Sequence, residues 1–118
     1  MRGVAKVDEN QGVIVDCLRK CGCRVEILSA VGGGVPDLLV GTPRGQLLLV
    51  EVKDGSKAAS RRVLTPDQER WHAEWRRYPL FIVTTVVEAL DAIGHECHEF
   101  DIHRNGRRSC VACNRELP

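Results

Sequence analysis

Two acidic residues and a lysine have the types and spacing for chemistry in this 118-residue chain. Asp37 opens one strongly apolar run and Glu51 closes the next. Each lies seven residues from Arg44, in the middle of the turn region between the runs. In a symmetric antiparallel hairpin the two carboxylates would face each other, with Cβ atoms about 4.5–5.5 Å apart. Like charges at that distance destabilise a sheet, whereas a divalent cation such as Mg²⁺ would hold both carboxylates.

Lys53 lies two residues after Glu51, so strand alternation places its ammonium group on the same face of the hairpin. A metal ion there can activate water and stabilise charge on a phosphate, while the lysine orients or deprotonates the attacking water. The alternative is an ordinary salt-bridged strand end. The flanking runs are too apolar for a surface ribbon, and GGGVP holds the backbone open beside Asp37, so the metal site is favoured.

A second cluster with ligand chemistry lies in the tail, GHECHEFDIHRNGRRSCVACNRELP. Structural Zn²⁺ takes four nitrogen or sulfur ligands in a tetrahedron, and a tail with almost no core needs such an ion to be ordered. We predict a zinc site of Cys97, His98, Cys110 and Cys113. His95 is the alternative to His98, because two adjacent ligands need an unusual backbone. A disordered tail with incidental cysteines, or a disulfide, is the competing interpretation.

The elements that position these residues follow from apolar periodicity and turn signals. Ile14, Cys17 and Leu18 begin an apolar helical stripe, and TPRG forms the turn of the hairpin. The predicted elements are a helix over 8–22, strands over 23–29, 36–41 and 46–52, a helix that opens at Thr65, a strand over 80–86 and a helix that opens at Thr85. The order is therefore α-β-β-β-α-β-α, which predicts an α/β fold with a mixed sheet.

Composition places the chain among ordinary globular proteins. Apolar residues are 43% and charged residues 28%, which excludes a disordered chain and a coiled coil. No apolar run is long enough to span a membrane, and the N-terminus does not resemble a secretory signal. We therefore expect a cytoplasmic protein whose thiols are reduced, with Cys17, Cys21 and Cys23 in the core. The abrupt change after Gly94 predicts a core over 1–93 and an appendage over 94–118.

The runs GVPDLLVG and LLLVEVK resemble the PD-(D/E)xK nuclease superfamily, and the predicted element order matches its restriction-endonuclease-like core. The longer pattern EVKDGSK followed by LTPDQ is similar to the small VRR-NUC and Holliday-junction-resolvase-like branch that is common in phages. The resemblance implies that Asp37, Glu51 and the Val52 backbone carbonyl bind Mg²⁺ or Mn²⁺, and that Lys53 is catalytic. The tail resembles short zinc-ribbon modules.

Two glutamines occupy positions where this resemblance implies further site residues. Gln68 matches a glutamine on the helix after the lysine strand, but it also has the spacing of a capping box with Thr65. Both roles would require a loose cap. The first helix of resolvase-like members carries a glutamate at the site. Alignment places Gln11 there, with Glu9 two positions away, and Gln11 also has a capping alternative.

Basic residues suggest contacts with a phosphate backbone, although the whole chain has a formal net charge of only +1. Solvated side chains on a loop are the alternative. Trp71 and Trp75 could stack on bases, but two aromatic residues on one helical face favour a core role. The candidate DNA-binding residues are Lys57, Arg61 and Arg62 after the active strand, and Arg107 and Arg108 in the tail.

The resemblance implies a metal-dependent endonuclease that hydrolyses DNA, with a preference for branched, flap or junction structures in recombination or repair. It also implies an intracellular setting, with the gene carried by a phage in a bacterial host. Resolvase-like members tend to form homodimers. The alternative is a zinc-ribbon nucleic-acid-binding or adaptor protein with an inactive nuclease-like core. A thiol redox protein is disfavoured because the CxxC lies in an arginine-rich tail.

Overall fold

The computed structural model describes residues 9–54, 64–95, 100–110 and 116–117. Its main sheet has the strand order β1-β2-β3-β4. Neighbours are antiparallel except for β3 and β4, which run parallel. The elements are α1 (Glu9–Lys20), β1 (Arg24–Ile27), β2 (Leu38–Gly41), β3 (Leu47–Val52), α2 (Pro66–Glu74), β4 (Leu80–Val83) and α3 (Val86–Ala92). This order and the mixed sheet confirm the predicted α/β fold.

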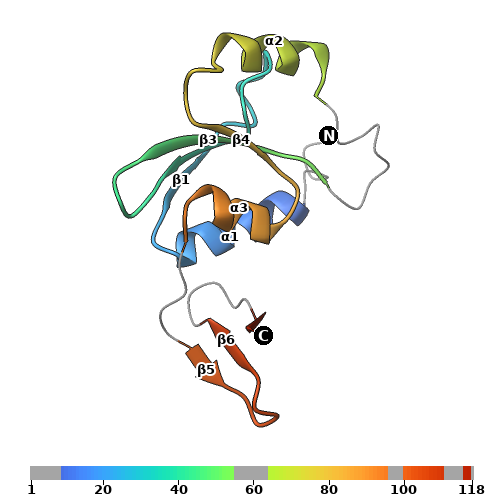
Figure 1. Cartoon of the computed structure of the whole chain (residues 1–118). Helices are drawn as coiled ribbons and strands as arrows, with labels where there is room; N and C mark the ends of the chain where they lie inside the picture. The colour runs from blue at the N-terminus through green and yellow to red at the C-terminus, as the bar shows by residue number, and fades with distance from the viewer. Residues whose placement is uncertain (1–8, 55–63, 96–99, 111–115, 118) are drawn as a thin grey trace.

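The helices form layers on the two faces of the sheet. Figure 1 shows α1 and α3 together on one face and α2 alone on the other. Parallel strands need a crossover connection, and α2 lies within the connection from β3 to β4. The sheet is therefore covered by two helices on one side and by one short helix on the other.

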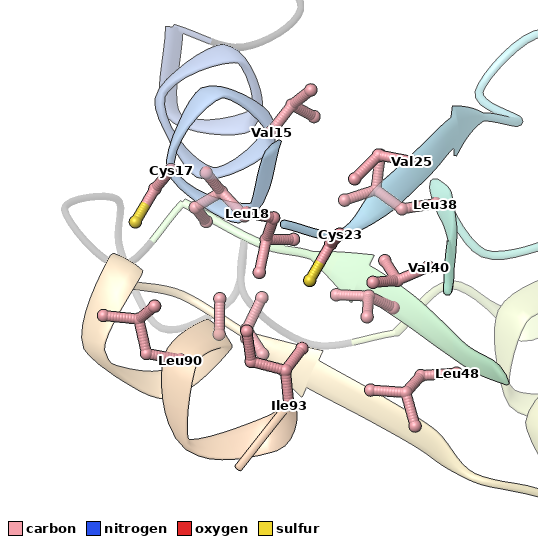
Figure 2. Close-up of a cluster of buried hydrophobic side chains, with 14 of the residues drawn as sticks. Val15, Cys17, Leu18, Cys23, Val25, Leu38, Val40, Leu48, Leu90 and Ile93 are labelled. Atoms are coloured by element: carbon pink, nitrogen blue, oxygen red, sulfur yellow. The ribbon is translucent and has the colours of Figure 1, made fainter. Parts of the chain in front are cut away.

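Strand alternation assigns different residues of the β2–β3 hairpin to the two faces. Leu38 pairs with Val50 and Val40 with Leu48, and all four side chains are buried. Figure 2 shows Leu38, Val40 and Leu48 within the cluster that also contains side chains from α1 and α3. Burial of large apolar side chains is the main favourable term in folding. The hydrophobic core therefore lies on the α1 and α3 face.

Local signals set the helix ends as the sequence predicts. The chain leaves α1 through Gly22, whose φ of 89° is a conformation that glycine adopts without strain. Thr65 caps α2 and Pro66 occupies its first turn. At α3, Thr85 accepts a hydrogen bond from the Glu88 backbone N–H. The Glu88 carboxylate accepts from the backbone N–H and the hydroxyl of Thr84, the residue before Thr85.

The thiols of the first helix and strand lie in or against the core, as predicted. Cys17 and Cys23 are buried, and Cys21 packs against the same cluster. Burial raises the pKa of the Cys23 thiol, and the nearby Cys17 raises it further. Because the thiolate is the reactive form, this environment keeps Cys23 in its less reactive state.

A second small sheet follows the main one. Its strands are β5 (Phe100–Ile102), β6 (Arg108–Cys110) and β7 (Glu116–Leu117), and both neighbouring pairs are antiparallel. The sequence did not predict these strands, because they are too short to show apolar alternation. The boundary between residues 93 and 94 stays a prediction. Every helix in the described part of the chain is too short or too polar to cross a bilayer.

Candidate active site

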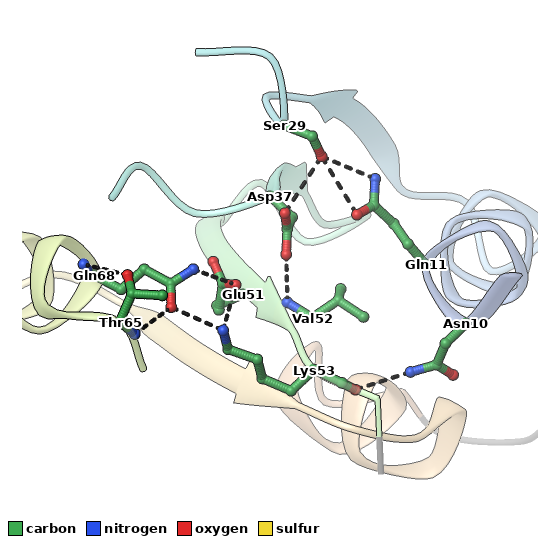
Figure 3. A network of polar contacts seen from close by, with 9 residues as sticks. All are labelled: Asn10, Gln11, Ser29, Asp37, Glu51, Val52, Lys53, Thr65 and Gln68. Atoms are coloured by element: carbon green, nitrogen blue, oxygen red, sulfur yellow. Dashed lines mark hydrogen bonds and ion pairs between the residues drawn. The ribbon is translucent and has the colours of Figure 1, made fainter. Parts of the chain in front are cut away.

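The hairpin register brings Asp37 and Glu51 together at one end of the sheet. Leu38 is paired with Val50, so the next position along the two strands places Asp37 opposite Glu51. Figure 3 shows both carboxylates at the same end of the hairpin, with Glu51 next to Gln68 of α2 and Asp37 between Ser29 and Val52. The predicted facing pair is therefore present, and its position follows from the length of the turn between β2 and β3.

Both oxygens of the Asp37 carboxylate accept hydrogen bonds. The backbone N–H of Val52 donates to Oδ2 at 2.9 Å, and the Ser29 hydroxyl donates to Oδ1 at 3.3 Å. In a strand, the N–H and C=O of one residue point to the same side. The Val52 carbonyl therefore faces the side on which Asp37 lies, where the resemblance implies a third metal ligand.

Glu51 is the most perturbed titratable group of the site. Its residue is only 3% exposed, and its Oε2 accepts from the Gln68 side-chain amide at 3.0 Å. Oε1 is buried and has no hydrogen-bond partner among the described residues. Burial, followed by the charge of Asp37, raises the pKa of Glu51 to about 7 although Lys53 opposes the shift. A buried carboxylate that has one oxygen without a hydrogen-bond partner, and a second carboxylate beside it, is suited to hold a cation.

Lys53 is held at both its side chain and its backbone. Its ammonium donates to Gln68 Oε1 at 2.8 Å and lies 3.5 Å from Glu51 Oε2. Its backbone N–H donates to the Val83 carbonyl at 2.9 Å. Its carbonyl accepts from the Asn10 side chain at 2.9 Å, which ties the end of β3 to α1. These contacts aim the ammonium at the carboxylate pair, as strand alternation predicts.

Gln68 joins the capping box of α2 to the site. Its Oε1 accepts from both the Thr65 backbone N–H, at 2.9 Å, and the Lys53 ammonium. Its Nε2 donates to Glu51. The expectation that both roles require a loose cap is wrong. A side-chain amide oxygen has two lone pairs and the amide nitrogen adds two donors, so one residue can serve the cap and the site together.

Gln11 is connected to Asp37 through the Ser29 hydroxyl. It is only 5% exposed, and its side chain lies within 3.1 Å of the Ser29 hydroxyl. A hydroxyl has one proton to donate, and a carboxylate is the stronger acceptor. The consistent arrangement is that Gln11 donates to Ser29 and Ser29 donates to Asp37. Gln11 thus faces the site, as the alignment predicts, whereas the side chain of Glu9 lies outside the described residues.

Two residues that support the site have no signal in the sequence. Ser29 follows β1, and Asn10 lies in the first turn of α1. Each contacts residues far along the chain: Ser29 lies beside Asp37, and Asn10 donates to the Lys53 and Thr84 carbonyls. Only knowledge of which segments pack together would have identified them.

The glycine loop, residues 32–34, lies just before Asp37 and lets α2 approach the sheet closely. Gly34 has a φ of 88°, and a Cβ at this position would collide with the backbone carbonyl of Asp67. The adjacent Gly33 also has a positive φ, but its added Cβ would meet no atom within 4 Å. Gly34 is therefore required for contact as well as for conformation. This close approach places Gln68 within reach of Glu51.

The predicted DNA-binding residues lie in different parts of the chain. Lys57, Arg61 and Arg62 belong to residues 55–63, outside the described residues. Arg108 begins β6 and Arg107 directly precedes it, and Figure 1 shows β6 beyond α1 and α3 and away from α2. Arg107 donates to the Glu116 carboxylate at 2.8 Å. The candidate tail contacts are therefore separate from the carboxylate pair.

One pair of predicted zinc ligands is brought together. The Cys110 sulfur lies 3.8 Å from His95 Nε2, across 15 residues of chain. Cys97, His98 and Cys113 lie outside the described residues. Within the described ranges, no group of three or more potential ligands surrounds a common point. The observed pair involves His95, the alternative to His98 in the predicted ligand set.

The aromatic residues of α2 are less buried than a core role predicts. No residue of α2 is fully buried, and Trp75 is 39% exposed. The rings of Trp71 and Trp75 stack at a centroid distance of 4.6 Å. Both line a cavity between α2 and the sheet. The preference for a core role was wrong for Trp75, because a helix of nine residues covers only part of this face.

Among known proteins, this chain matches a solved structure. No family model matches the chain, and no curated protein matches it either. A solved structure described as "VRR_NUC domain" is 32% identical, covers 72% of this chain and 90% of its own, and superposes with a TM-score of 0.55. With the mixed four-stranded sheet and the hairpin described above, this likeness shows that the chain belongs to the VRR_NUC domain family and has its nuclease-like fold.

Proposed function

We propose that this protein is a metal-dependent endonuclease that hydrolyses phosphodiester bonds in DNA. The observation that carries the proposal is the buried Glu51 carboxylate, which faces Asp37 and has one oxygen without a hydrogen-bond partner among the described residues. A purely structural ion pair would not place a second carboxylate opposite the buried Glu51 with one lysine for the two carboxylates, because the second negative charge is left uncompensated.

The residues present fit a hard divalent cation. Asp37, Glu51 and the Val52 carbonyl would hold Mg²⁺ or Mn²⁺ through oxygen, the ligand type that these ions prefer. When bound, the ion supplies Lewis acidity toward a phosphate oxygen and lowers the pKa of water. Gln11 lies behind Ser29 and contributes a neutral amide, so we propose that it orients Asp37 through the hydroxyl.

Lys53 and Gln68 contact the Oε2 atom of Glu51. The Lys53 ammonium is held between Gln68 Oε1 and Glu51 Oε2, where it can hold the attacking water and offset charge that develops on the phosphate. Gln68 fixes that ammonium through one end of its amide and fixes Glu51 through the other. It is a positioning residue whose place is determined by the cap of α2.

DNA would reach the site across the connection between β3 and α2. Lys57, Arg61 and Arg62 lie in this connection, and we propose that they bind the phosphate backbone. A chain of this size offers little surface for reading sequence, so we propose selectivity for branched, flap or junction DNA. Phosphate contacts predict that binding weakens as salt concentration rises.

The test is cleavage of a matched panel of linear, flap and four-way junction DNA in Mg²⁺. Lys53→Ala and Asp37→Ala should each lower the cleavage rate by about 100-fold or more, since the first removes the ammonium that offsets charge on the phosphate and the second removes a ligand of the metal ion. Glu26→Gln, which removes an exposed carboxylate from β1, should cleave normally. Absence of cleavage by the unmodified protein, or normal cleavage by Lys53→Ala, would contradict the proposal.

We also propose a structural zinc site in the tail. The proximity of Cys110 and His95 favours His95 over His98, with Cys97 and Cys113 completing the set. Metal analysis should find one zinc per chain, and His95→Ala should lose it while His98→Ala retains it. Retention of zinc by His95→Ala and loss by His98→Ala would show instead that His98 is the ligand. Absence of zinc from the unmodified protein would contradict the site.

A further inference from the structure

An apolar cavity of about 350 Å³ lies between α2 and the sheet, beside the carboxylate pair. Leu39 and Leu49 form part of its floor, and Trp71, Trp75 and Tyr78 contribute aromatic walls. The described residues that line it carry no charge. Because Trp71 of α2 and Leu39 and Leu49 of the sheet line it, the cavity lies on the face of the sheet that α2 covers, opposite the hydrophobic core. Neither the core packing nor the proposed metal site requires this space.

The aromatic walls of the cavity stack on one another, and the Trp71 and Trp75 ring centroids are only 4.6 Å apart, so only the outer faces of this pair can receive another ring. The Trp71 and Trp75 rings are almost parallel, with an interplanar angle of 4°, and Tyr78 continues the series at 5.4 Å from Trp75. Trp75 and Tyr78 are 39% and 57% exposed, so this surface is accessible from solvent. Flat aromatic faces of this kind are the usual platforms on which unpaired bases stack.

The cavity is in register with the candidate catalytic pair. Asp37 faces Glu51, and two residues further along the same strands Leu39 pairs with Leu49 on the same face. At 3.2–3.4 Å per residue, the floor of the cavity begins about 7 Å from the carboxylates. Successive nucleotides of one strand are about 3.4 Å apart along the axis of a duplex, and an unstacked strand is more extended. A base in the cavity would therefore belong to a nucleotide within about two positions of the cleaved bond.

The cavity's size and charge environment restrict its occupant. At about 350 Å³ it is near the lower end of small-molecule sites, which suits one planar group. A docked helix would require a groove that accommodates anchors over two turns. Arg76 and Arg77 are exposed between the wall residues Trp75 and Tyr78 in sequence, and neither has an ion-pair partner among the described residues. Two exposed cations next in sequence to the wall residues suit an anionic ligand with a flat apolar part, as a nucleotide has.

We infer that this cavity binds an unpaired nucleobase of the DNA substrate, stacked on an outer face of the Trp71–Trp75 pair. This inference rests on the proposed function. The nuclease would then select DNA in which a nucleotide next to the cleaved bond is already unpaired. A base inside a duplex would first have to be extruded from the stack, which costs free energy. Flap and junction DNA supply such a base without that cost.

Tryptophan fluorescence tests the inference directly, because the chain has two tryptophans and both line the cavity. The full-length protein, with Lys53→Ala to keep the strands intact and with Mg²⁺ present, is titrated with a 12-nucleotide single strand or with the same sequence as a blunt duplex. The single strand should quench the emission and the duplex should not. Trp75→Leu should weaken single-strand binding by about 5- to 150-fold, the range for loss of one base stack.

Matched variants separate stacking from folding. Trp75→Tyr keeps an aromatic face and should restore most of the binding, whereas Val13→Ala, at an exposed position of α1, should change nothing. Equal quenching by both DNAs, or normal binding by Trp75→Leu, would overturn the inference. Emission that changes on dilution of the protein alone would assign the cavity to contact between copies and overturn it as well.

The same protein preparations distinguish this failure from failure of the proposed function. Quenching by the single strand without cleavage by the unmodified protein would support the base site and contradict the nuclease. Cleavage of DNA without quenching would support the nuclease and contradict the base site.

Discussion

The two faces of the main sheet are built from alternate residues of the same strands, yet they have opposite character. On one face Leu38, Val40 and Val50 are sealed by α1 and α3. On the other, Asp37 and Glu51 face α2, and an accessible cavity lies beside them. The buried face stabilises the strands, so the open face can accommodate a carboxylate pair that is unfavourable by itself.

The largest expected effect compares one leucine from each face. Leu38 is fully buried, whereas its neighbour Leu39 is half-buried at the cavity. Leu38→Ala should lower the free energy of unfolding by about 3–5 kcal/mol, because it leaves a void in close-packed surroundings. Leu39→Ala should lower it by about 1 kcal/mol, since the lost side chain already borders open space. Urea denaturation measures both, and equal losses would show that the two faces are packed alike.

The next effect is a pH dependence of stability that comes from Glu51 on the open face. The folded-state pKa of Glu51 is about 7, against an ordinary value of 4.5. Between these values the folded state binds more protons than the unfolded state at this carboxyl, so the free energy of unfolding falls as pH rises. The titration of Glu51 lowers the free energy of unfolding by about 3 kcal/mol at most. The decrease is absent below about pH 4.5 and complete above pH 7.

Thermal melts from pH 4 to 8 measure this dependence. At pH 8, Mg²⁺ should raise the melting temperature, because the ion binds the ionised pair and stabilises the folded state. Glu51→Gln should remove the downward trend assigned to this group and weaken the effect of Mg²⁺. An unchanged trend in Glu51→Gln would mean that another group causes it.

The contact between the glycine loop and α2 should respond to a single methyl group. Gly34→Ala should destabilise the protein by about 2 kcal/mol and reduce cleavage, because the methyl group both strains a positive φ and displaces the start of α2 from Glu51. Gly33→Ala is the control: it carries the strain without the collision, so its cleavage rate should stay near normal. Equal loss of activity in both variants would attribute the effect to backbone strain.

The smallest effect concerns the hydrogen bonds behind Asp37. Ser29→Ala removes the hydroxyl that joins Gln11 to Asp37, and should cost about 1 kcal/mol of stability while lowering the affinity for Mg²⁺. Isothermal titration with Mg²⁺ measures the affinity. Ser29→Thr keeps the hydroxyl and should retain most of the affinity for Mg²⁺. Unaltered affinity in Ser29→Ala would show that the Val52 N–H alone orients Asp37.

Much of the fold could be predicted, because its signals are local. The apolar runs around TPRG determined the hairpin and its register, and therefore the opposition of Asp37 and Glu51. Thr65, Pro66 and Gln68 marked the start of α2. The strands of the small second sheet were not predicted, because two or three residues carry no measurable periodicity.

The candidate site was predicted less completely, for a reason seen in Gln68 and Trp75. Residue types identified both, but their roles depend on how much of the sheet α2 covers. Gln68 meets Glu51 because Gly34 allows a close approach, and Trp75 stays partly exposed because the helix is short. Neither the approach nor the coverage can be read from spacing.

By itself, the sequence determined which residues share a face of the hairpin, since side-chain alternation and turn length depend only on neighbours in the chain. Tertiary structure alone decided which partners meet that face: Ser29 and Gln11 behind Asp37, Asn10 at the end of β3, and an aromatic cavity instead of a closed core. Gln11 and Ser29 are 18 residues apart, and Asn10 and Lys53 are 43 apart. Such contacts depend on the packing of whole helices against a sheet, which no local pattern records.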